Sequence, residues 1–405
     1  MEAEIEFIPR GTITSPKGFQ AGATYAGINK KGKYGLDLGI LLSAAPGVAA
    51  AVFTTNRIKA APVILCQQRL QDGRATAIVV NSGCANACTS EQGLVDAAKM
   101  AKLAAESMGL SPEDVLVAST GVIGPPLPMR LIGAGIERIV LSAHGGHKLA
   151  KAMITTDTVP KETAVASVTN GSEFIVGGVA KGSGMIHPNL ATMLCFLTTD
   201  AAVDLDFLKL ALRKAVDISF NMVSVDGDTS PNDMVLIMAN GLAKNKPISQ
   251  GSGQADVFQQ ALDKVSTYLA KSIARDGEGA TKLIEVTING ATREAEARMA
   301  ARTIVSSPLV KTAVHGCDPN WGRIIAAVGR SSVEVVESKI DLCIGDIRLV
   351  KEGSPLPFSK QSVARVLGRS EVPISLNLNL GTATATAWGC DLSEEYVTVN
   401  SQYTT

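Results

Sequence analysis

The stretch KGSGMIHPNLATMLCFLTTD, from Lys181 to Asp200, begins with a glycine turn, passes a Pro-Asn corner and continues as an apolar strand. Its run of apolar residues predicts a buried strand. Such a strand accepts valine where this one carries Thr192, and threonine is common in strands because it is β-branched. A purely structural role and a chemical role for Thr192 are therefore both open at this point.

On both sides of this stretch, strand patterns alternate with helix patterns. This alternation predicts an α/β fold, a layered sandwich of helices on β-sheets. The tail from about 372 to 398 is expected to be rich in strands, at 374–380, 382–388 and 396–399. Further strands are predicted at 76–83, 115–120, 163–169, 173–180, 234–240 and 282–290, and helices at 90–110, 129–139, 149–154 and 204–220.

Three segments carry helix-start signals. Thr89 followed by Gln92 predicts a capping box for the helix at 90–110, which Gly109 closes. Ser111-Pro112-Glu113 predicts a second helix start, and Asp204 is the expected N-cap of the helix that follows it.

Composition narrows the range of functions. The chain has 405 residues, 46% of them hydrophobic and 19% charged, which is typical of a globular protein with a large core. Lys plus Arg and Asp plus Glu are both 38, so the formal net charge of zero favours a small ligand and predicts neither nucleic acid nor membrane partners. The N-terminus lacks a signal or transit pattern, and the seven scattered cysteines fit reduced thiols, so a cytoplasmic protein is expected.

Several common sites are poorly matched. His144 and His147 form a close histidine pair without a further ligand at binding spacing, so no metal is expected. Neither a P-loop nor a complete dinucleotide-binding motif occurs, and the G-x-S-x-G motif of serine hydrolases is absent. The acidic loop at 225–233 is explained by turn formation. No bound cofactor is predicted.

A threonine hydroxyl becomes a good nucleophile when a neighbouring base takes its proton, and the α-amine of an N-terminal threonine is one such base. The pKa of that amine is about 8, whereas the pKa of a lysine side chain is about 10.4, so a useful fraction of the amine is neutral at working pH. An internal Thr192 reaches this state only if the chain is cut before it, by attack of its hydroxyl on the Ala191 carbonyl.

The segment KGSGMIHPNLATML resembles the self-cleaving segment of the ornithine acetyltransferase family, also called the glutamate N-acetyltransferase family, of arginine biosynthesis. The resemblance covers essentially the whole chain. It includes, in order, VNSGCANACT (80–89), ASTGVIG (118–124), MITTDTVPK (153–161), DGEGATK (276–282), HGCDPNWGRI (315–324) and the terminal YVTVNSQYTT (396–405).

This resemblance implies self-cleavage between Ala191 and Thr192, giving an α chain of residues 1–191 and a β chain of residues 192–405 that pack as one unit with a fold like that of DmpA-type aminopeptidases. It implies that Thr192 is the nucleophile and that Thr120 and Gly121 form the oxyanion hole. It also assigns substrate contacts to Thr155, Lys181, Thr192, Glu278, Asn400 and Thr405.

The implied reaction moves an acetyl group from N2-acetylornithine to glutamate through an acetyl-Thr192 intermediate, with acetyl-CoA as a possible co-substrate for some relatives. Lys181 can pair with a substrate carboxylate and Glu278 with the ornithine ammonium. The family commonly assembles as α2β2 or larger species. Two alternatives stay open: an N-terminal-threonine amidohydrolase or aminopeptidase of the same fold, and an uncleaved binding protein.

Overall fold

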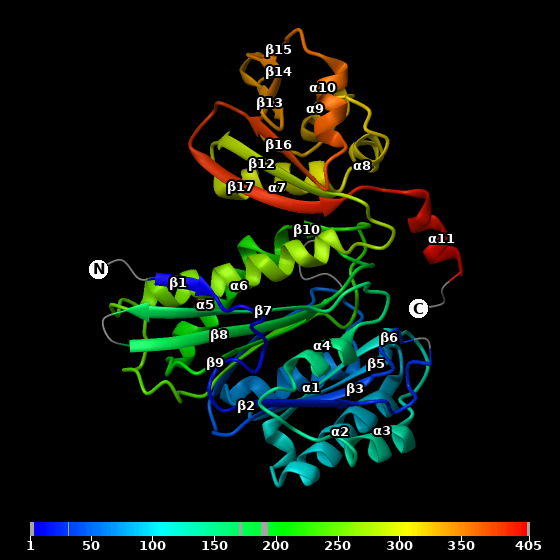
Figure 1. Ribbon diagram of the computed structural model, residues 1–405, viewed down its shortest axis with the longest axis vertical. Coiled ribbons are helices and arrows are strands. Elements are labelled where there is room, and N and C mark those ends of the chain that lie inside the picture. The colour runs from blue at the N-terminus through cyan, green and yellow to red at the C-terminus, as the bar shows by residue number, and fades with distance from the viewer. Residues whose placement is uncertain (1–3, 31, 170–171, 188–192, 403–405) are drawn as a thin grey trace.

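The computed structural model describes residues 4–30, 32–169, 172–187 and 193–402. Within these ranges the strands form three sheets with helices packed on them (Figure 1). Their strand orders are β1-β7-β8-β9-β11-β4, β10-β17-β12-β16-β13-β14-β15 and β2-β3-β5-β6.

The strands are β1 (Glu4–Phe7), β2 (Phe19–Thr24), β3 (Leu38–Ser43), β4 (Val48–Phe53), β5 (Ala77–Cys84), β6 (Val115–Val122), β7 (Lys161–Thr169), β8 (Ser172–Lys181), β9 (Leu194–Thr199), β10 (Val223–Ser224), β11 (Met234–Ala239), β12 (Leu283–Ala291), β13 (Asp341–Ile344), β14 (Ile347–Lys351), β15 (Ser354–Pro355), β16 (Glu371–Asn377) and β17 (Ala383–Cys390). The helices are α1 (Ala61–Arg69), α2 (Ser90–Met108), α3 (Met129–Ile136), α4 (Gly146–Met153), α5 (Leu205–Ile218), α6 (Ala255–Arg275), α7 (Glu294–Val305), α8 (Pro308–His315), α9 (Gly322–Gly329), α10 (Lys360–Leu367) and α11 (Glu394–Gln402). No helix formed by the described residues combines the length and apolar character needed to span a membrane.

The strand at the end of the quoted stretch, β9, lies in the interior of the six-stranded sheet. It pairs in parallel with β11, with Cys195 opposite Val235, and every residue of both strands is buried. Alternate side chains enter cores on opposite faces, as Cys195 does on one face and Phe196 on the other. A strand covered on both faces needs a continuous apolar run, which this sequence provides.

The six-stranded sheet is covered on both sides by other layers (Figure 1). One face packs against the four-stranded sheet and α4, and the helices α2 and α3 lie on the outer side of that second sheet. The other face packs against α5 and α6, where Phe258 contacts Phe174 and Phe207 with ring centroids 5.8 and 6.0 Å apart. Helix α6 also contacts β17 of the seven-stranded sheet, so the core continues into the C-terminal layer. The predicted sandwich of helices on sheets is confirmed.

Residues before and after position 191 are interleaved in one sheet. In the order β1-β7-β8-β9-β11-β4, the strands β9 and β11 follow position 191 in the chain, and the strands on both sides of them precede it. Backbone hydrogen bonds and two shared cores therefore hold the two parts together, whether or not the peptide bond between them is intact.

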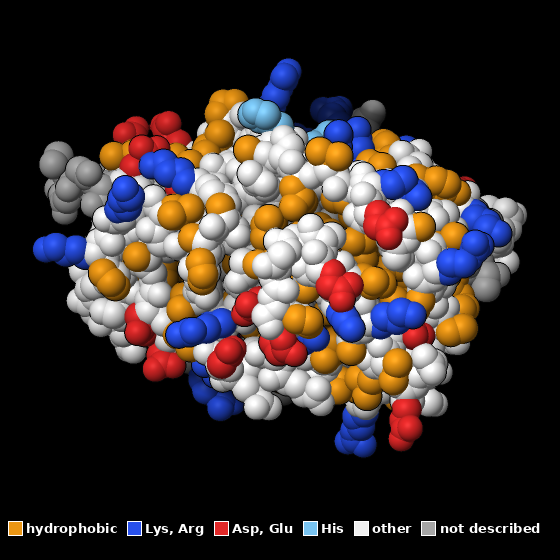
Figure 2. Space-filling model, turned by 90° about the horizontal axis from the view of Figure 1, so that it is seen from below, with side chains coloured by type: hydrophobic (Ala, Val, Ile, Leu, Met, Phe, Trp, Pro, Cys, Tyr) orange, Lys and Arg blue, Asp and Glu red, His pale blue; other side chains and the backbone are white. Residues whose placement is uncertain are grey.

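Charged side chains are mixed over the surface seen in Figure 2. On this face, Lys and Arg lie among Asp and Glu, and no large area carries one sign of charge. This distribution agrees with a formal net charge of zero.

The helix predicted from residue 90 is confirmed as α2, but its predicted capping box is wrong, and so is the helix start predicted at Ser111. Thr89 precedes α2, but its side chain donates to Asn86 Oδ1 (2.8 Å) and caps no backbone amide, while Gln92 donates to Asp96 (2.9 Å). Ser111 precedes only a single 3₁₀ turn, Pro112–Asp114, because its hydroxyl bonds Glu113 and β6 begins directly afterwards.

The predicted strand at 396–399 is also wrong, because these residues belong to helix α11 (Figure 1). The segment YVTV, in a tail rich in strand patterns, predicted a strand there. Asp391 turns the chain away from the sheet after β17 by accepting from the backbone amides of Thr281 and Lys282, both at 2.8 Å. Glu394 and Glu395 then lie in the first turn of a helix, where negative charge is stabilising.

The predicted N-cap of α5 is confirmed, and we expect it to contribute measurably to stability. The Asp204 carboxylate accepts from the backbone amides of Asp206 and Phe207, both at 3.1 Å. Asp204→Ala is expected to lower the free energy of unfolding by about 1 kcal/mol. Asp206→Ala is the matched control, since it removes an acidic side chain from the same turn without removing the cap. Equal losses of thermal stability in both variants would contradict the capping role.

Candidate active site

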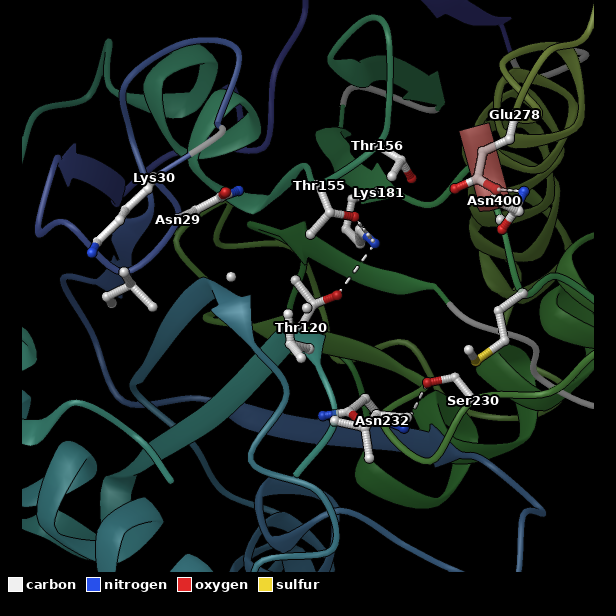
Figure 3. Close-up of a pocket in the computed structure, with 17 residues that line it drawn as sticks. Asn29, Lys30, Thr120, Thr155, Thr156, Lys181, Ser230, Asn232, Glu278 and Asn400 are labelled. Atoms are coloured by element: carbon white, nitrogen blue, oxygen red, sulfur yellow. Dashed lines mark hydrogen bonds between the residues drawn. The ribbon is translucent and has the colours of Figure 1, made fainter. Parts of the chain in front are cut away.

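A cavity of about 280 Å³ lies where the ends of β5, β6 and β8 meet the loops at 226–233 and 276–280 (Figure 3). Six residues that the family resemblance selected line it together: Thr120, Gly121, Thr155, Lys181, Glu278 and Asn400. They come from distant parts of the chain, so the fold brings them together. Ala191, Thr192 and Thr405 lie outside the described residues.

Close backbone packing positions Thr120 and Gly121 at the end of β6. Gly121 has a φ of +125°, and a Cβ added there would meet the backbone of Gly83 at 2.4 Å. Gly83, at the end of the paired strand β5, is itself packed on Asn29, where an added Cβ would meet Asn29 Cα at 2.8 Å. Side chains are excluded from both positions, because a Cβ at Gly121 would push the strand ends apart and a Cβ at Gly83 would collide with Asn29. This explains Gly83 in the 80–89 motif and Gly121 in the 118–124 motif.

Asn232 connects the ends of the same two strands through its side chain, and the sequence did not reveal this role. Its side-chain amide donates to the carbonyl of Ala85 (2.6 Å) and to that of Ser119 (2.8 Å), next to Thr120. Asn232 and Ser230 also line the cavity. Their segment is rich in turn-forming residues and was explained as a turn, so local sequence carried no signal for these long-range contacts.

Lys181, at the end of β8, contributes a buried ammonium group to the cavity. Its Nζ donates to Thr155 Oγ1 (3.0 Å) and to Thr120 Oγ1 (3.2 Å), as Figure 3 shows. Because the Thr120 oxygen accepts from Lys181, its own proton is free to be donated to a ligand. Burial lowers the pKa of Lys181 below that of an ordinary lysine, although the nearby charge of Asp157 opposes this.

Glu278 and Asn400 form a second polar group on the far side of the cavity from Thr120 in Figure 3. Asn400 Nδ2 donates to Glu278 Oε2 at 2.8 Å, and the Glu278 amide donates to the Ser183 carbonyl at 2.8 Å. Gly184 allows this approach, because an added Cβ would lie 2.4 Å from the Glu278 carboxyl group. The cavity therefore offers a cation from one wall and a carboxylate from another.

Asp233 is a further buried carboxyl group that sequence reasoning passed over. One of its oxygens accepts from the backbone amide of Met193 (2.9 Å), the residue that follows Thr192 in the chain. Its other oxygen, Oδ2, is buried and has no hydrogen-bond partner among the described residues. Burial raises the pKa of Asp233 well above its ordinary value. The loop at 225–233 thus does more than form a turn.

Metal ligands do not gather in this cavity or elsewhere in the described part of the chain, where no group of three or more His, Cys, Asp or Glu side chains is placed to hold a metal ion. Of the two histidines in the close pair, His147 contacts Glu162 through Nδ1. The chemistry that the described site residues offer is that of hydroxyl, ammonium, carboxylate and amide groups.

Comparisons with known proteins identify the family of the chain. A model of the ArgJ family matches residues 20–405. The arginine biosynthesis bifunctional protein ArgJ of Dehalococcoides mccartyi is 52% identical over 405 residues, with 100% of both chains covered. The protein of the same name from Symbiobacterium thermophilum is 52% identical over 397 residues, with 98% of this chain and 99% of that one covered. The crystal structure of the arginine biosynthesis bifunctional protein ArgJ of Bacillus halodurans shares 48% sequence identity with this chain and has a TM-score of 0.50, covering 51% of this chain and 97% of the solved one. The chain belongs to the ArgJ family.

Proposed function

We propose that this protein is a glutamate N-acetyltransferase of arginine biosynthesis that transfers the acetyl group of N2-acetylornithine to glutamate. The observation that carries the proposal is the convergence of Thr120, Gly121, Thr155, Lys181, Glu278 and Asn400 on one cavity. The 52% identity to relatives named for arginine biosynthesis, over the whole chain, supports the same reaction.

The charges of the cavity fit the proposed donor. N2-acetylornithine carries a carboxylate and, at the far end of its side chain, an ammonium group. Lys181 would pair with the carboxylate, and Glu278, held by Asn400, would pair with the ammonium. Buried charges need partners of opposite sign, so a ligand with both charges suits these walls better than a neutral one does.

The proposed reaction has two halves. In the first, the α-amine of Thr192 takes the proton of its own hydroxyl, and Oγ attacks the acetyl carbon. The Thr120 hydroxyl and the Gly121 amide would stabilise the resulting oxyanion. When the C–N bond breaks, the protonated α-amine returns its proton to the departing ornithine nitrogen. In the second half, the glutamate amine attacks the acetyl-Thr192 ester and the same proton movements run in reverse.

The proposal includes self-cleavage between Ala191 and Thr192, with residues 1–191 and 192–405 as the two chains. The interleaved six-stranded sheet supports it, because both parts would stay together after the cut. The solved Bacillus halodurans chain is matched over 97% of its length yet covers 51% of this chain, so it is about half as long.

We further propose that the reaction needs no bound cofactor and that acetyl-CoA can serve as a second acetyl donor. We also propose that the enzyme is cytoplasmic and assembles as α2β2 or a larger species.

The first experiment is the mass of the purified chain under denaturing conditions. Two fragments that meet between Ala191 and Thr192 are expected. The cleaved protein is then incubated with N2-acetylornithine labelled in its acetyl group, without glutamate, and the fragment that begins at Thr192 is expected to gain one acetyl group. Addition of glutamate should remove the label and yield labelled N-acetylglutamate. Release of free acetate at the same rate without glutamate would instead indicate a hydrolase.

The buried position of Lys181 predicts a pH dependence of substrate binding. Because burial lowers the pKa of Lys181, its ammonium group loses its proton at a lower pH than an ordinary lysine, whose pKa is about 10.4. The KM for N2-acetylornithine should therefore rise with pH while an ordinary lysine is still charged. Initial rates between about pH 7 and 10 test this. A KM that stays constant to pH ~10 would contradict it.

A further inference from the structure

A buried charge cluster that the proposed reaction does not use lies directly behind the cavity. Lys161, at the start of β7, is 2% exposed, and its Nζ donates to Asp157 Oδ1 (2.6 Å) and to Asp276 Oδ2 (2.5 Å). Both carboxylates are themselves buried. The three residues belong to the 153–161 and 276–282 motifs, in which the family resemblance assigns roles only to Thr155 and Glu278.

Asp157 connects this cluster to the walls of the cavity. Its Oδ1 also accepts from the Gly182 amide (2.7 Å), and its Oδ2 accepts from the Thr155 amide (3.1 Å). Gly182 directly follows Lys181. Burial alone would raise the pKa of Asp157, but the charges of Lys161 and Lys181 and the hydrogen bonds from Lys161 and the Gly182 amide outweigh burial and hold that pKa well below normal. Asp157 is therefore a carboxylate, and it lies within the electrostatic reach of Lys181.

Lys181 and Asp157 nevertheless make no ion pair. Among the described residues, Lys181 Nζ has no carboxylate within ion-pairing distance, and its hydrogen bonds go to the hydroxyls of Thr120 and Thr155. Asp157 instead pairs with Lys161, which has Asp276 as its second anionic partner. A buried ammonium group without its own carboxylate remains available to a carboxylate from a ligand.

We propose that Lys161 is a positioning residue that keeps Asp157 engaged and thereby leaves Lys181 free for the carboxylate of the substrate. The inference rests on the proposed function, since it deepens the role that the substrate gives to Lys181. The charge cluster also connects the two parts of the chain, because Lys161 and Asp157 precede position 191 while Asp276 follows it. Asp276 accepts from the Thr158 amide (3.0 Å), which fixes the loop that carries Glu278.

The test compares a charged substrate with a neutral one. In Lys161→Met, Asp157 loses its cation and Lys181 becomes its nearest partner, so the KM for N2-acetylornithine should rise about tenfold to a hundredfold. Acetylation of the cleaved enzyme by p-nitrophenyl acetate, which has no carboxylate, should change by less than about twofold. A general loss of structure would slow both reactions, and equal slowing would overturn the proposal.

The double variant Asp157→Asn/Lys161→Met provides the matched control. It removes the competing carboxylate together with its cation, so Lys181 is released and the KM should return to within about threefold of the original value. A double variant at least as impaired as Lys161→Met would overturn the proposal. Asp276 loses Lys161 but keeps its hydrogen bond from the Thr158 amide in both variants, so the comparison isolates Asp157. If Lys161→Met does not fold, the double variant still decides, because Asp157 then leaves no uncompensated charge beside Lys181. The unmodified enzyme separates the two hypotheses: failure to transfer acetyl from N2-acetylornithine overturns the proposed function, whereas normal transfer with an unchanged KM in Lys161→Met overturns only this inference.

Discussion

Thr120→Val is expected to lower kcat for acetyl transfer by about two to three orders of magnitude, with a much smaller change in KM. Valine has nearly the shape of threonine and fits the buried position, but it lacks the hydroxyl that accepts a hydrogen bond from Lys181. If that hydroxyl stabilises the oxyanion, its loss raises the free energy of the transition state more than that of the bound substrate. Steady-state rates with N2-acetylornithine and glutamate measure both constants.

Two further variants control this result. Thr120→Ser keeps the hydroxyl and should retain most of the activity. Thr155→Val removes the other hydroxyl that Lys181 contacts, at 3.0 Å, and should act mainly on KM because Thr155 is assigned to substrate binding. If Thr155→Val and Thr120→Val lowered kcat equally, the loss would come from disturbing Lys181, and the oxyanion role of Thr120 would be rejected.

Gly121→Ala is expected to destabilise the fold by about 2–5 kcal/mol and to abolish most of the activity. The residue has a φ of +125°, which costs an alanine conformational energy, and the new Cβ would meet Gly83 and Cys84 backbone atoms at 2.4 to 2.7 Å. Backbone cannot rotate away as a side chain can, so β5 and β6 would have to separate. That movement would displace Thr120 as well.

Gly124→Ala is the control that distinguishes the backbone strain of an alanine at positive φ from the steric clash expected in Gly121→Ala. Gly124 also has a positive φ, of +103°, but an added Cβ would have no atom within 4 Å. Its substitution should therefore cost only the conformational strain, about 1–2 kcal/mol, and should leave more activity. Thermal unfolding and the acetyl-transfer rate of both variants test the comparison. Equal destabilisation would show that close packing against Gly83 is unimportant.

Local patterns were sufficient for the elements whose own residues determine them. The apolar runs of β9 and β11 and the Asp204 cap of α5 are confirmed, because burial and a nearby backbone amide depend on residues close in the chain. The same approach was wrong where another hydrogen-bond partner competes, either nearby, as Asn86 does for Thr89, or far away, as Thr281 does for Asp391. Thr89 bonds Asn86 instead of capping α2, and Asp391 diverts the chain so that 396–399 becomes part of α11.

By itself, the sequence determined the layered α/β class, the position of about half of the strands and of fewer of the helices and, through its motifs, the family and six residues that line one cavity. Only the tertiary structure decided how those residues are supported: Asn232 across the ends of β5 and β6, Gly121 against Gly83, and Lys161 between two carboxylates. The reason is physical. Helices and strands follow from periodic patterns of neighbouring residues, whereas contacts between residues far apart in the chain, such as Asn232 with Ala85 and Lys161 with Asp276, exist only after the layers have packed.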